Sequence, residues 1–391
     1  MFAPTNLNRF AGDSVRITEL AKGLRGCGVR VKLIIPDGGD PSIVARFGDS
    51  QTFPVPLYGS TNLRFASLLF FSQYLSPQWL FRSGLDILQM EVPIALPLSK
   101  IRRLADLPNI VFDMHSIMSI DLQPYLPTTA YVLIKPILDA AQGFLCRNAH
   151  CTVVSNSMKK YVLQRWDVDP DRIHVITNGV DTDLAGHAMV EFADHFDYLR
   201  EGADPLLVYV GGLEWYEGVD IAIRALPTLK RTLPNIRLVI AGRGTEESHL
   251  RSITSHLGLD TTVRFEGWVP YEETFALQSA ADILIAPRKP LQSAGIDIST
   301  PMKIPSYLTA GRPIVASSVG EIPYVARHSE EAYLIPHSDI RSFIDAVLTV
   351  WGDESLCERL SKNAKKRAEH YSWKRISLEL VSLYNEILNA S

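Results

Sequence analysis

The chain has 391 residues, of which 46% are hydrophobic and 21% charged, and a formal net charge of −4. This composition is that of a soluble globular protein and excludes a disordered or collagen-like chain. At roughly 150 residues per domain, the length predicts about two or three domains. The slightly acidic balance argues against a dedicated nucleic-acid binder, whose affinity depends on a basic surface, so we expect no nucleic-acid partner.

Cysteine usage and the first residues indicate a reducing, cytoplasmic compartment. The four cysteines are too few and too scattered for a disulfide framework or a zinc site. Met1 is not followed by the basic and apolar regions of a signal peptide. Residues 65–81 are apolar and uncharged, but polar residues interrupt them and the stretch is too short to span a membrane. It is interpreted as a buried core helix or, alternatively, as a helix that docks on the cytoplasmic face of a membrane.

The first half of the chain alternates short apolar runs with segments of helical period. A helix before the first strand is predicted by apolar residues at helical spacing, namely Ile17, Leu20, Ala21 and Leu24. Strands are predicted after this helix at residues 30–35, 85–90, 109–112 and 151–154. Strands that alternate with helical segments are typical of βαβ units and a parallel sheet.

A second series of the same kind begins near residue 206. Its predicted strands lie at residues 206–210, 236–242, 262–267, 282–287 and 312–317. The stretch between residues 181 and 205 has no strong strand pattern and separates the two series. We therefore predict an N-terminal domain over residues 1–183 and a C-terminal domain over residues 184–371.

The last segment, residues 372–391, has the pattern of a long amphipathic helix. Its apolar side chains fall on one stripe that consists of Ile376, Leu380, Leu383, Tyr384 and Ile387. A basic cluster precedes and begins this helix, with Lys362, Lys365, Lys366, Arg367, Lys374 and Arg375. These cations form either a solvated helix face or a contact with anionic membrane lipid.

Ligands of open parallel sheets bind at the carboxyl ends of the strands, where loops and helix N-termini present free N–H groups. Two places in the first half of the chain fit this rule. Gly12 leads into the first helix, where it permits close approach of a phosphate or sugar or simply forms a turn. His115 follows the strand at residues 109–112, and it either lines a ligand cleft or is a hydrogen-bonded structural residue.

Two glycine-containing pairs follow strands of the second series. Gly211-Gly212 ends one apolar strand and Arg243-Gly244 follows the end of the next. Because the carboxyl ends of parallel strands meet at one edge of a sheet, we expect both pairs at the same edge. Either pair alone fits a tight turn, whereas together they favour a cleft lined by backbone.

Cations follow a later strand of the same series. Arg288 and Lys289 come directly after the strand at residues 282–287, and Lys303 follows further along the chain. Lys and Arg side chains offset the charge of a diphosphate, so this group suits such a ligand. The alternative is a surface loop with solvated cations.

Several common catalytic motifs are missing from the sequence. There is no Walker phosphate loop, no HExxH, no GxSxG and no GxGxxG at the first helix. Readings as a P-loop NTPase, a metalloprotease, an α/β-hydrolase or a dinucleotide-dependent dehydrogenase therefore lose their main support.

The order of the remaining segments resembles the retaining GT-B glycosyltransferases of family 4 over nearly the whole chain. The most specific stretch is PMKIPSYLTAGRPIVASSVGEIPYVA at residues 301–326, which is similar to the family's P-x-K-x-x-E-Y-x-A-x-G-x-P-V-V-A-S segment. AGDSVRITELAKGLRGCGVRV resembles its first glycine loop and helix, and VVSNSMKKYVLQRWDVDPDRIHVITNGVD resembles the end of its N-terminal domain. VGGLEWYEGVDIAIRAL and LVIAGRG resemble the opening strands of its C-terminal domain.

The resemblance implies an α/β fold of two Rossmann-like βαβ domains that face each other across a cleft, with residues 372–391 crossing back onto the N-terminal domain. It implies a retaining, metal-independent and cofactor-free transfer of a hexose from a nucleotide sugar to a glycan, lipid-linked or small-molecule acceptor. His115 matches the family's histidine near the transferred sugar. On the donor side, Gly12 matches the loop near the phosphates, Arg243-Gly244 the nucleoside pocket, and Lys303 the motif lysine.

Departures from the family pattern concern the donor. Gly212 and Glu217 stand where the family often has an Arg and a Lys that contact phosphate. We therefore expect Arg288, Lys289 and Lys303 to bind the phosphates instead. Ser306 stands where a Glu usually holds the ribose, and its neutral hydroxyl makes roughly half as strong a hydrogen bond. These departures leave open a non-catalytic GT-B partner subunit or binding module. A GT-B sugar-nucleotide epimerase should show an acidic cleft pair, which we do not find.

Overall fold

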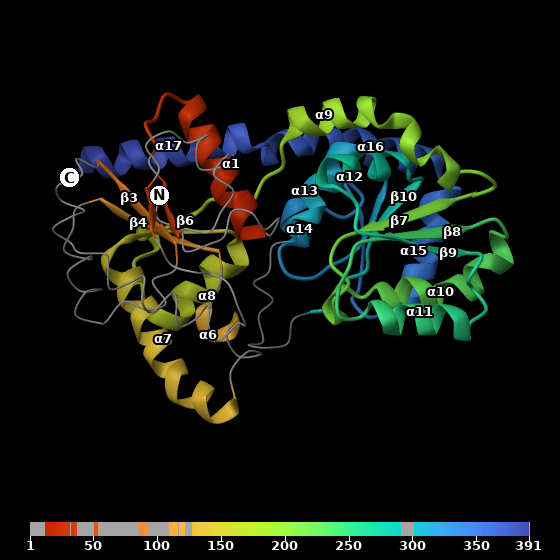
Figure 1. Ribbon diagram of the computed structural model, residues 1–391, viewed down its shortest axis with the longest axis horizontal. Helices are drawn as coiled ribbons and strands as arrows, with labels where there is room; N and C mark the ends of the chain where they lie inside the picture. The colour runs from red at the N-terminus through yellow and green to blue at the C-terminus, as the bar shows by residue number, and fades with distance from the viewer. Residues whose placement is uncertain are drawn as a thin grey trace. The chain divides into compact units, whose positions relative to one another are not determined.

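The computed structural model describes residues 12–31, 33–36, 51–53, 86–91, 109–115, 117–121, 127–290 and 301–390. The chain divides into two compact units, which are considered separately (Figure 1). Unit 1 comprises residues 1–178 and 373–391, and unit 2 comprises residues 179–372. Each unit contains a parallel sheet with helices packed against it.

Unit 1 is built on a parallel sheet with the strand order β3-β4-β5-β6. Its strands are β3 (Leu88–Glu91), β4 (Ile110–Met114), β5 (His150–Val153) and β6 (Ile173–Val175), and a separate parallel pair joins β1 (Ile34–Pro36) and β2 (Gln51–Phe53). The described helices are α1 (Gly12–Gly26), α6 (Met118–Asp121), α7 (Thr128–Asn148), α8 (Asn156–Trp166), η2 (Pro170–Arg172) and α17 (Trp373–Ala390). Every residue of β4 is buried, as expected for a central strand of a parallel sheet.

The C-terminal helix α17 belongs to unit 1, although the chain reaches it from unit 2. It is crossed by α1 (Figure 1), and Leu20 and Leu24 of α1 pack in one cluster with Trp373 of α17. All five residues of the predicted apolar stripe are buried in this cluster, which confirms the predicted helical face: Ile376, Leu380, Leu383, Tyr384 and Ile387. Their burial against α1 and the sheet is what attaches the end of the chain to the N-terminal part.

Unit 2 contains a six-stranded parallel sheet with the order β12-β11-β10-β7-β8-β9. The strands are β7 (Leu206–Val210), β8 (Arg237–Ala241), β9 (Val263–Gly267), β10 (Ile283–Ala286), β11 (Ile314–Ser317) and β12 (Tyr333–Ile335). The helices before β10 are α9 (Thr182–Glu191), η3 (Ala193–Leu199), η4 (Trp215–Glu217), α10 (Val219–Thr232), α11 (Glu247–His256) and α12 (Tyr271–Ala280). Those after β10 are α13 (Lys303–Ala310), α14 (Ile322–Val325), α15 (Ile340–Gly352), α16 (Glu354–Ala368) and η5 (Glu369–Tyr371).

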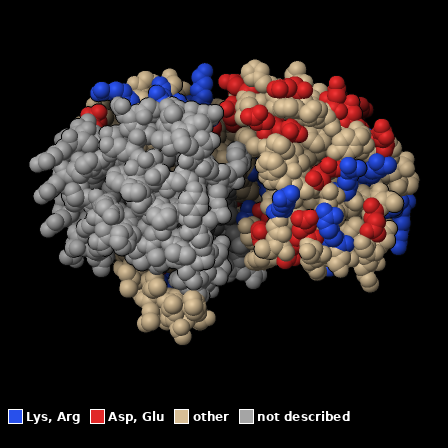
Figure 2. All heavy atoms as spheres, in the orientation of Figure 1, with Lys and Arg blue, Asp and Glu red and all other residues tan. Residues whose placement is uncertain are grey.

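The helices of unit 2 cover both faces of its sheet. Apolar residues of α10, α11 and α15 fill the core on one face, and those of α12, α13 and α14 fill it on the other (Figure 1). Aspartates cap three of the helices, because Asp181, Asp339 and Asp353 each accept a hydrogen bond from a backbone N–H in the first turn. On the face of unit 2 visible in Figure 2, acidic and basic side chains are interspersed.

Most predicted strands coincide with observed ones, and the differences have simple causes. The strand at residues 206–210 is confirmed in full, and the others are shifted by one or a few residues. The strand predicted at residues 30–35 begins only at Ile34, because β2 pairs with residues 34–36 alone. Three short strands were not predicted, namely β2, β6 and β12, because three residues are too few to show a period.

The boundaries of the units differ slightly from the predicted 183/184 and 371/372. Residues 179–183 belong to unit 2, because the Val180 amide donates to the Tyr371 carbonyl and the Val180 side chain packs with Ala185 and Phe275. Ser372 also belongs to unit 2, through its isolated bridge with Val180.

Two sequence segments with a predicted membrane role have different outcomes. Residues 65–81 lie outside the described residues. The basic cluster is split, since residues 362–367 belong to α16 in unit 2 and residues 374–375 to α17 in unit 1. Two of these cations have partners, because Arg367 donates to the carbonyls of Tyr324 and Val325 and Arg375 pairs with Glu379. Within the described ranges, no helix has the length and apolarity needed to cross a membrane.

Candidate functional site

The loops after β7, β8 and β9 are joined through their backbones. The Gly211 amide donates to the Ala241 carbonyl at 2.9 Å, and the Gly242 amide donates to the Gly267 carbonyl at 2.6 Å. Gly242 has a φ of +142°, and a Cβ built there would lie 1.8 Å from the carbonyl oxygen of Gly211. Only glycine permits this approach. The backbone of Gly211, Gly242 and Gly267 therefore forms a rim at the carboxyl edge of the sheet, which we call the glycine rim.

The second predicted glycine pair lies on the same rim. The Leu213 amide donates to the Arg243 carbonyl, and a Cβ on Gly244 would lie 2.3 Å from the Leu213 carbonyl oxygen. The expectation that Gly211-Gly212 and Arg243-Gly244 share one edge of the sheet is thus confirmed. The Arg243 side chain is exposed at this edge.

A short segment after this rim holds an acidic residue against the loop that follows β10. Glu217 is the last residue of η4, and Gly218 follows it with a φ of +69° and no room for a Cβ, which would lie 1.9 Å from the Pro287 carbonyl oxygen. The Lys289 amide donates to the Tyr216 carbonyl at 2.7 Å. The two loops are therefore fixed to each other by backbone contacts, and Glu217 is placed between them.

Glu217 binds Lys303, the first residue of α13. The Lys303 Nζ lies 2.5 Å from Glu217 Oε2 and donates to the Tyr209 hydroxyl at 2.7 Å. The ammonium also lies 4.3 Å from the centre of the Tyr209 ring. A Cβ on Gly211 would come within 2.7 Å of Nζ, so the glycine rim leaves the space that the lysine occupies.

Glu217 also faces Arg288, two residues after β10. The Arg288 NH1 atom lies 3.9 Å from Glu217 Oε1, and the guanidinium lies 5.1 Å from the centre of the Tyr216 ring. Arg288 is only 5% exposed, yet no acceptor in the described part of the chain takes a hydrogen bond from its buried Nε. Lys303, Glu217 and Arg288 form what we call the buried triad, which carries two cations and one carboxylate.

The charges of the triad shift each other's protonation. Burial alone would raise the pKa of Glu217, but the charges of Lys303 and Arg288 and the lysine's hydrogen bond outweigh it and hold this pKa below its usual value. Burial lowers the pKa of Lys303, and the carboxylate of Glu217 opposes that shift. The 2.5 Å contact is therefore an ion pair, and it neutralises one of the two cations internally.

The other predicted donor-side residues have partners within unit 2. The Lys289 ammonium pairs with Asp220 at 2.8 Å. The Ser306 hydroxyl is buried and donates to the Gln278 side chain of α12 at 2.9 Å. The structure thus brings Lys303 and Arg288 together, as expected, but it engages Lys289 and Ser306 in contacts of their own.

Two predicted residues lie in unit 1, which is described by itself. His115 directly follows β4 and is half-buried, and Gly12 is the first residue of α1. One buried ion pair among the described residues of this unit is not predicted from the sequence: Arg16 of α1 donates to both carboxylate oxygens of Asp113, at 3.0 and 3.2 Å. The only sequence signal for this pair is that Asp113 lies at the end of an apolar strand, because a charged residue there requires a partner.

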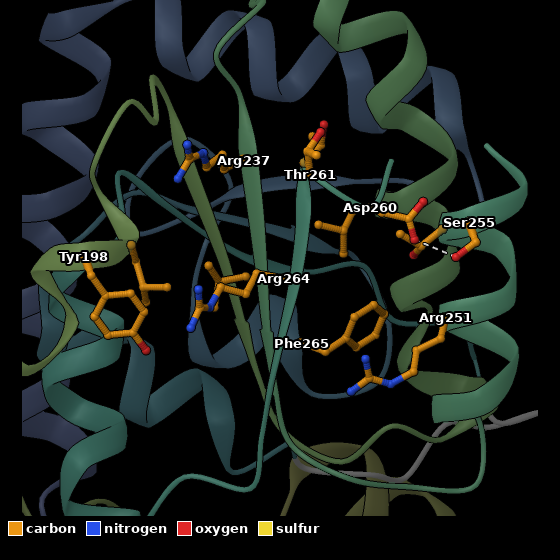
Figure 3. Close-up of a pocket in the computed structure, with 13 residues that line it drawn as sticks. Tyr198, Arg237, Arg251, Ser255, Asp260, Thr261, Arg264 and Phe265 are labelled. Atoms are coloured by element: carbon orange, nitrogen blue, oxygen red, sulfur yellow. Dashed lines mark hydrogen bonds between the residues drawn. The ribbon is translucent and has the colours of Figure 1, made fainter. Parts of the chain in front are cut away.

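A cavity of about 510 Å³ lies elsewhere in unit 2, beside the edge strand β9 (Figure 3). It extends from Arg237, the first residue of β8, and is therefore not centred on the carboxyl edge of the sheet. Two arginines at this cavity already have partners: Arg251 bonds Glu247 and stacks on Phe265, and Arg264 pairs with Glu266 and stacks on Tyr198. The glycine rim and the buried triad are thus the better candidate site.

No three His, Cys, Asp or Glu side chains in the described ranges are arranged to hold a metal ion. Among the described residues, the candidate site has the charged groups of the triad, the Lys289–Asp220 pair and the exposed guanidinium of Arg243. Arg288 is a buried cation whose Nε has no acceptor in the described part of the chain. Such a group, beside a rim of backbone, can bind an anion such as a phosphate.

Comparison with known proteins shows the family and the fold of the chain. The family model described as Glycosyltransferase Family 4 matches residues 11–184, and the model described as Glycosyl transferases group 1 matches residues 190–367. The chain belongs to this glycosyltransferase family. Its fold is the GT-B fold, with one Rossmann-like parallel-sheet unit in each matched half.

Among curated members of the family, an uncharacterised glycosyltransferase of Methanocaldococcus jannaschii is 28% identical over 257 residues, which are 62% of this chain and 62% of that protein. A phosphatidyl-myo-inositol mannosyltransferase of Mycobacterium leprae is 26% identical over 396 residues, which are 99% of this chain and 96% of that protein. The chain therefore spans under two thirds of the archaeal relative but nearly all of the mycobacterial one.

Solved structures show the same fold at low sequence identity. Sucrose-phosphate synthase from Thermosynechococcus elongatus matches with a TM-score of 0.72 at 18% identity, over 97% of this chain and 94% of that one. The Anabaena protein HepE, solved in complex with UDP and glucose, matches with a TM-score of 0.69 at 16% identity, over 98% of both chains.

Proposed function

We propose that this glycosyltransferase transfers a sugar from a nucleotide-sugar donor to a glycan, lipid-linked or small-molecule acceptor with retention at the anomeric carbon. The observation that carries the proposal is the buried triad beside the glycine rim. Arg288 is almost fully buried, and its Nε donates to no acceptor among the described residues, which is costly unless a ligand supplies one. A diphosphate supplies the acceptor oxygens and the negative charge that the guanidinium lacks.

In this proposal, Arg288 and Lys303 bind the donor phosphates and stabilise the leaving diphosphate as charge develops on it. Gly211, Gly212 and Gly244 let the nucleotide approach the backbone closely. Because these cations take the role that a metal plays in other transferases, we propose that transfer requires no metal ion. HepE, a member of the same fold solved with UDP and glucose, supports a nucleotide-sugar donor for this chain too.

The remaining assignments rest on the family resemblance. We propose His115 as the catalytic residue near the transferred sugar and Gly12 as part of the phosphate loop. Arg243 is proposed at the nucleoside, where its exposed guanidinium is available. Ser306 remains a proposed ribose contact, although its hydroxyl is engaged with Gln278.

One observation favours the second candidate function, a non-catalytic binding module. The carboxylate of Glu217 neutralises Lys303, and Ser306 is bonded within the protein, so two donor contacts of the family are altered. Such a module would bind its ligand without releasing nucleotide. The two functions are separated by incubating each bound nucleotide sugar with the protein and candidate acceptors, and by measuring nucleotide release.

The site itself is tested by calorimetric titration with UDP-, GDP-, ADP- and dTDP-sugars. The wild type should bind one of them with micromolar affinity, and Lys303→Gln should weaken that binding at least about 10-fold, a loss of about 1.4 kcal/mol. Lys366→Gln, which removes the same charge from an exposed position of α16, should leave the affinity unchanged. Equal affinities of all three proteins would show that the phosphates bind elsewhere.

A further inference from the structure

Glu217 occupies the position in which a phosphate would be expected. Its two carboxylate oxygens are divided between the cations, with Oε2 on Lys303 at 2.5 Å and Oε1 facing Arg288 at 3.9 Å. A phosphoryl group likewise presents several oxygens to Lys and Arg side chains. The carboxylate therefore substitutes, within the protein itself, for the anion that the two cations would otherwise bind.

The carboxylate of Glu217 lowers the net positive charge of the triad. With Glu217 ionised, the triad carries a net charge of +1, because one of its two cations is neutralised. A nucleotide sugar brings two negative charges in its diphosphate. If Glu217 stayed in place, its carboxylate would lie against the phosphates in a site that water reaches poorly, where like charges repel strongly.

Of the two contacts that Glu217 makes with the cations, the one with Arg288 is the easier for a phosphate to replace. Hydrogen bonds from an arginine to a carboxylate lie near 2.8 Å, and the 3.9 Å separation here is too long for one. The Lys303 contact is short and is reinforced by the Tyr209 hydroxyl. An entering phosphate would therefore take Arg288 first and would then compete with Glu217 for Lys303.

We propose that Glu217 is an internal counter-ion, which must leave the two cations or take up a proton from solvent when the donor diphosphate binds, so that this residue sets the affinity of the site for nucleotide sugars. The inference rests on the proposed function, because it assumes that the phosphates bind at the triad. In the absence of donor, Glu217 holds Lys303 and Arg288 in place and offsets their buried charge. Binding replaces the carboxylate with phosphoryl oxygens.

The proposal makes binding dependent on protons. The charged and titratable groups that face Glu217 within the described residues are Lys303 and Tyr307 of α13, Arg288 after β10 and Tyr209 of β7. In the free protein the two cations hold the pKa of Glu217 low. A bound diphosphate adds negative charge beside the carboxylate, which raises this pKa and favours uptake of a proton. Affinity should therefore rise as the pH falls through the pKa of the donor-bound state.

The test is calorimetric titration of the wild type, Glu217→Gln and Glu331→Gln with the same nucleotide sugars, in buffers of different ionisation enthalpy. Glu217→Gln keeps the shape and an oxygen acceptor for Lys303 but removes the charge. It should bind about 10-fold more tightly than the wild type and should lose the proton uptake. Glu331, a buried carboxylate of unit 2 that pairs with Arg327, provides the matched control, and its variant should bind as the wild type does.

The other outcomes separate this inference from the proposed function. If the wild type binds and Glu217→Gln binds equally or more weakly, Glu217 only positions Lys303, and the inference is overturned while the donor site stands. If Lys303→Gln leaves the affinity unchanged, the donor site is wrong and the inference fails with it. Binding by Glu217→Gln alone would support the inference in its strongest form, and binding by none of the proteins would overturn both proposals.

A fold check completes the experiment. Each variant is compared with the wild type by thermal unfolding, and Glu217→Ser serves as a second variant without the carboxylate if Glu217→Gln does not fold. The pH dependence of wild-type affinity needs no variant at all. An affinity that stays constant from about pH 8 to about pH 5.5 would contradict the coupled uptake of a proton.

Discussion

Each unit of the protein contains a buried arginine beside a carboxylate, and the two arginines differ in how completely they are bonded. Arg16 in unit 1 donates to both oxygens of Asp113, to the Thr177 carbonyl and to the Asn178 side chain. Arg288 in unit 2 faces Glu217 at 3.9 Å, and its Nε donates to no described residue. The first arginine is a structural element, and the second has the unfilled bonding of a ligand-binding cation.

The surroundings of the two carboxylates extend this difference. Asp113 also accepts hydrogen bonds from Gln89 and Thr152, so its buried charge is fully solvated by the protein. Glu217 instead divides its two oxygens between Lys303 and Arg288, and only the lysine contact is short. Burial of a charged side chain is therefore a weak guide to function. The number of its hydrogen-bonding groups that have no partner among the described residues is a better guide.

The largest expected effect is the loss of the Arg16–Asp113 pair. Arg16→Gln leaves Asp113 as an uncompensated buried charge, which should destabilise unit 1 by about 3–5 kcal/mol. Hydrogen exchange of the β4 backbone amides measures this loss, because these amides exchange only when the central strand opens. Lys22→Gln removes an exposed pair with Glu19 on the same helix and should cost less than about 1 kcal/mol. Equal protection of β4 in Arg16→Gln and the wild type would contradict the structural role of Arg16.

Acid should weaken the same pair. Burial alone would raise the pKa of Asp113, but Arg16 and the hydrogen bonds outweigh it and hold this pKa below its usual value. The ion pair thus contributes stability above the unfolded-state pKa of about 4, and this contribution is lost as the pH falls through the folded-state pKa. We expect unfolding of unit 1 on acidification to be less steep in Asp113→Asn than in the wild type. Parallel acid profiles of the two proteins would argue against this assignment.

We expect a smaller loss of stability when a glycine beside the triad is replaced and the charges of the triad are kept. Gly242→Ala introduces a Cβ 1.8 Å from the Gly211 carbonyl oxygen at a φ of +142°. The strain should cost about 1–3 kcal/mol, and the shifted rim should also weaken donor binding, because Gly211 lies against Lys303. Gly352→Ala, where a Cβ would meet open space, provides the control and should change the free energy of unfolding by less than about 0.5 kcal/mol. Wild-type stability and donor affinity of Gly242→Ala would contradict the role of the glycine rim in the donor site.

The sequence predicted the scaffold of the site better than its charges. Apolar runs such as residues 206–210 and 236–242 gave the central strands of unit 2, and the glycines after them were expected at one edge. Parallel strands buried on both faces have a strong local pattern, which explains this success. The three-residue strands β6 and β12 have too little pattern to be recognised.

The triad could not be predicted, because its members are far apart in the sequence. Glu217 and Arg288 meet only because β10 pairs with β7, and Lys303 joins them from the start of α13. Glu217 departs from the family pattern, but nothing in the local sequence shows that it would bind the two cations expected to replace the missing ones. The pairing of Ser306 with Gln278 likewise depends on the packing of α12 against α13.

The most direct test of the account is thermal unfolding of the wild type and Arg288→Gln, with and without the nucleotide sugar that binds in calorimetry. Without donor, the unfolding temperature of Arg288→Gln should lie within a few degrees of that of the wild type, since the free energy of unfolding should change by less than about 1 kcal/mol. With donor, the unfolding temperature of the wild type should rise, as for any ligand that binds only the folded state, and that of Arg288→Gln should not. A large loss of stability without donor, or an equal rise in both proteins, would show that Arg288 is a structural residue like Arg16.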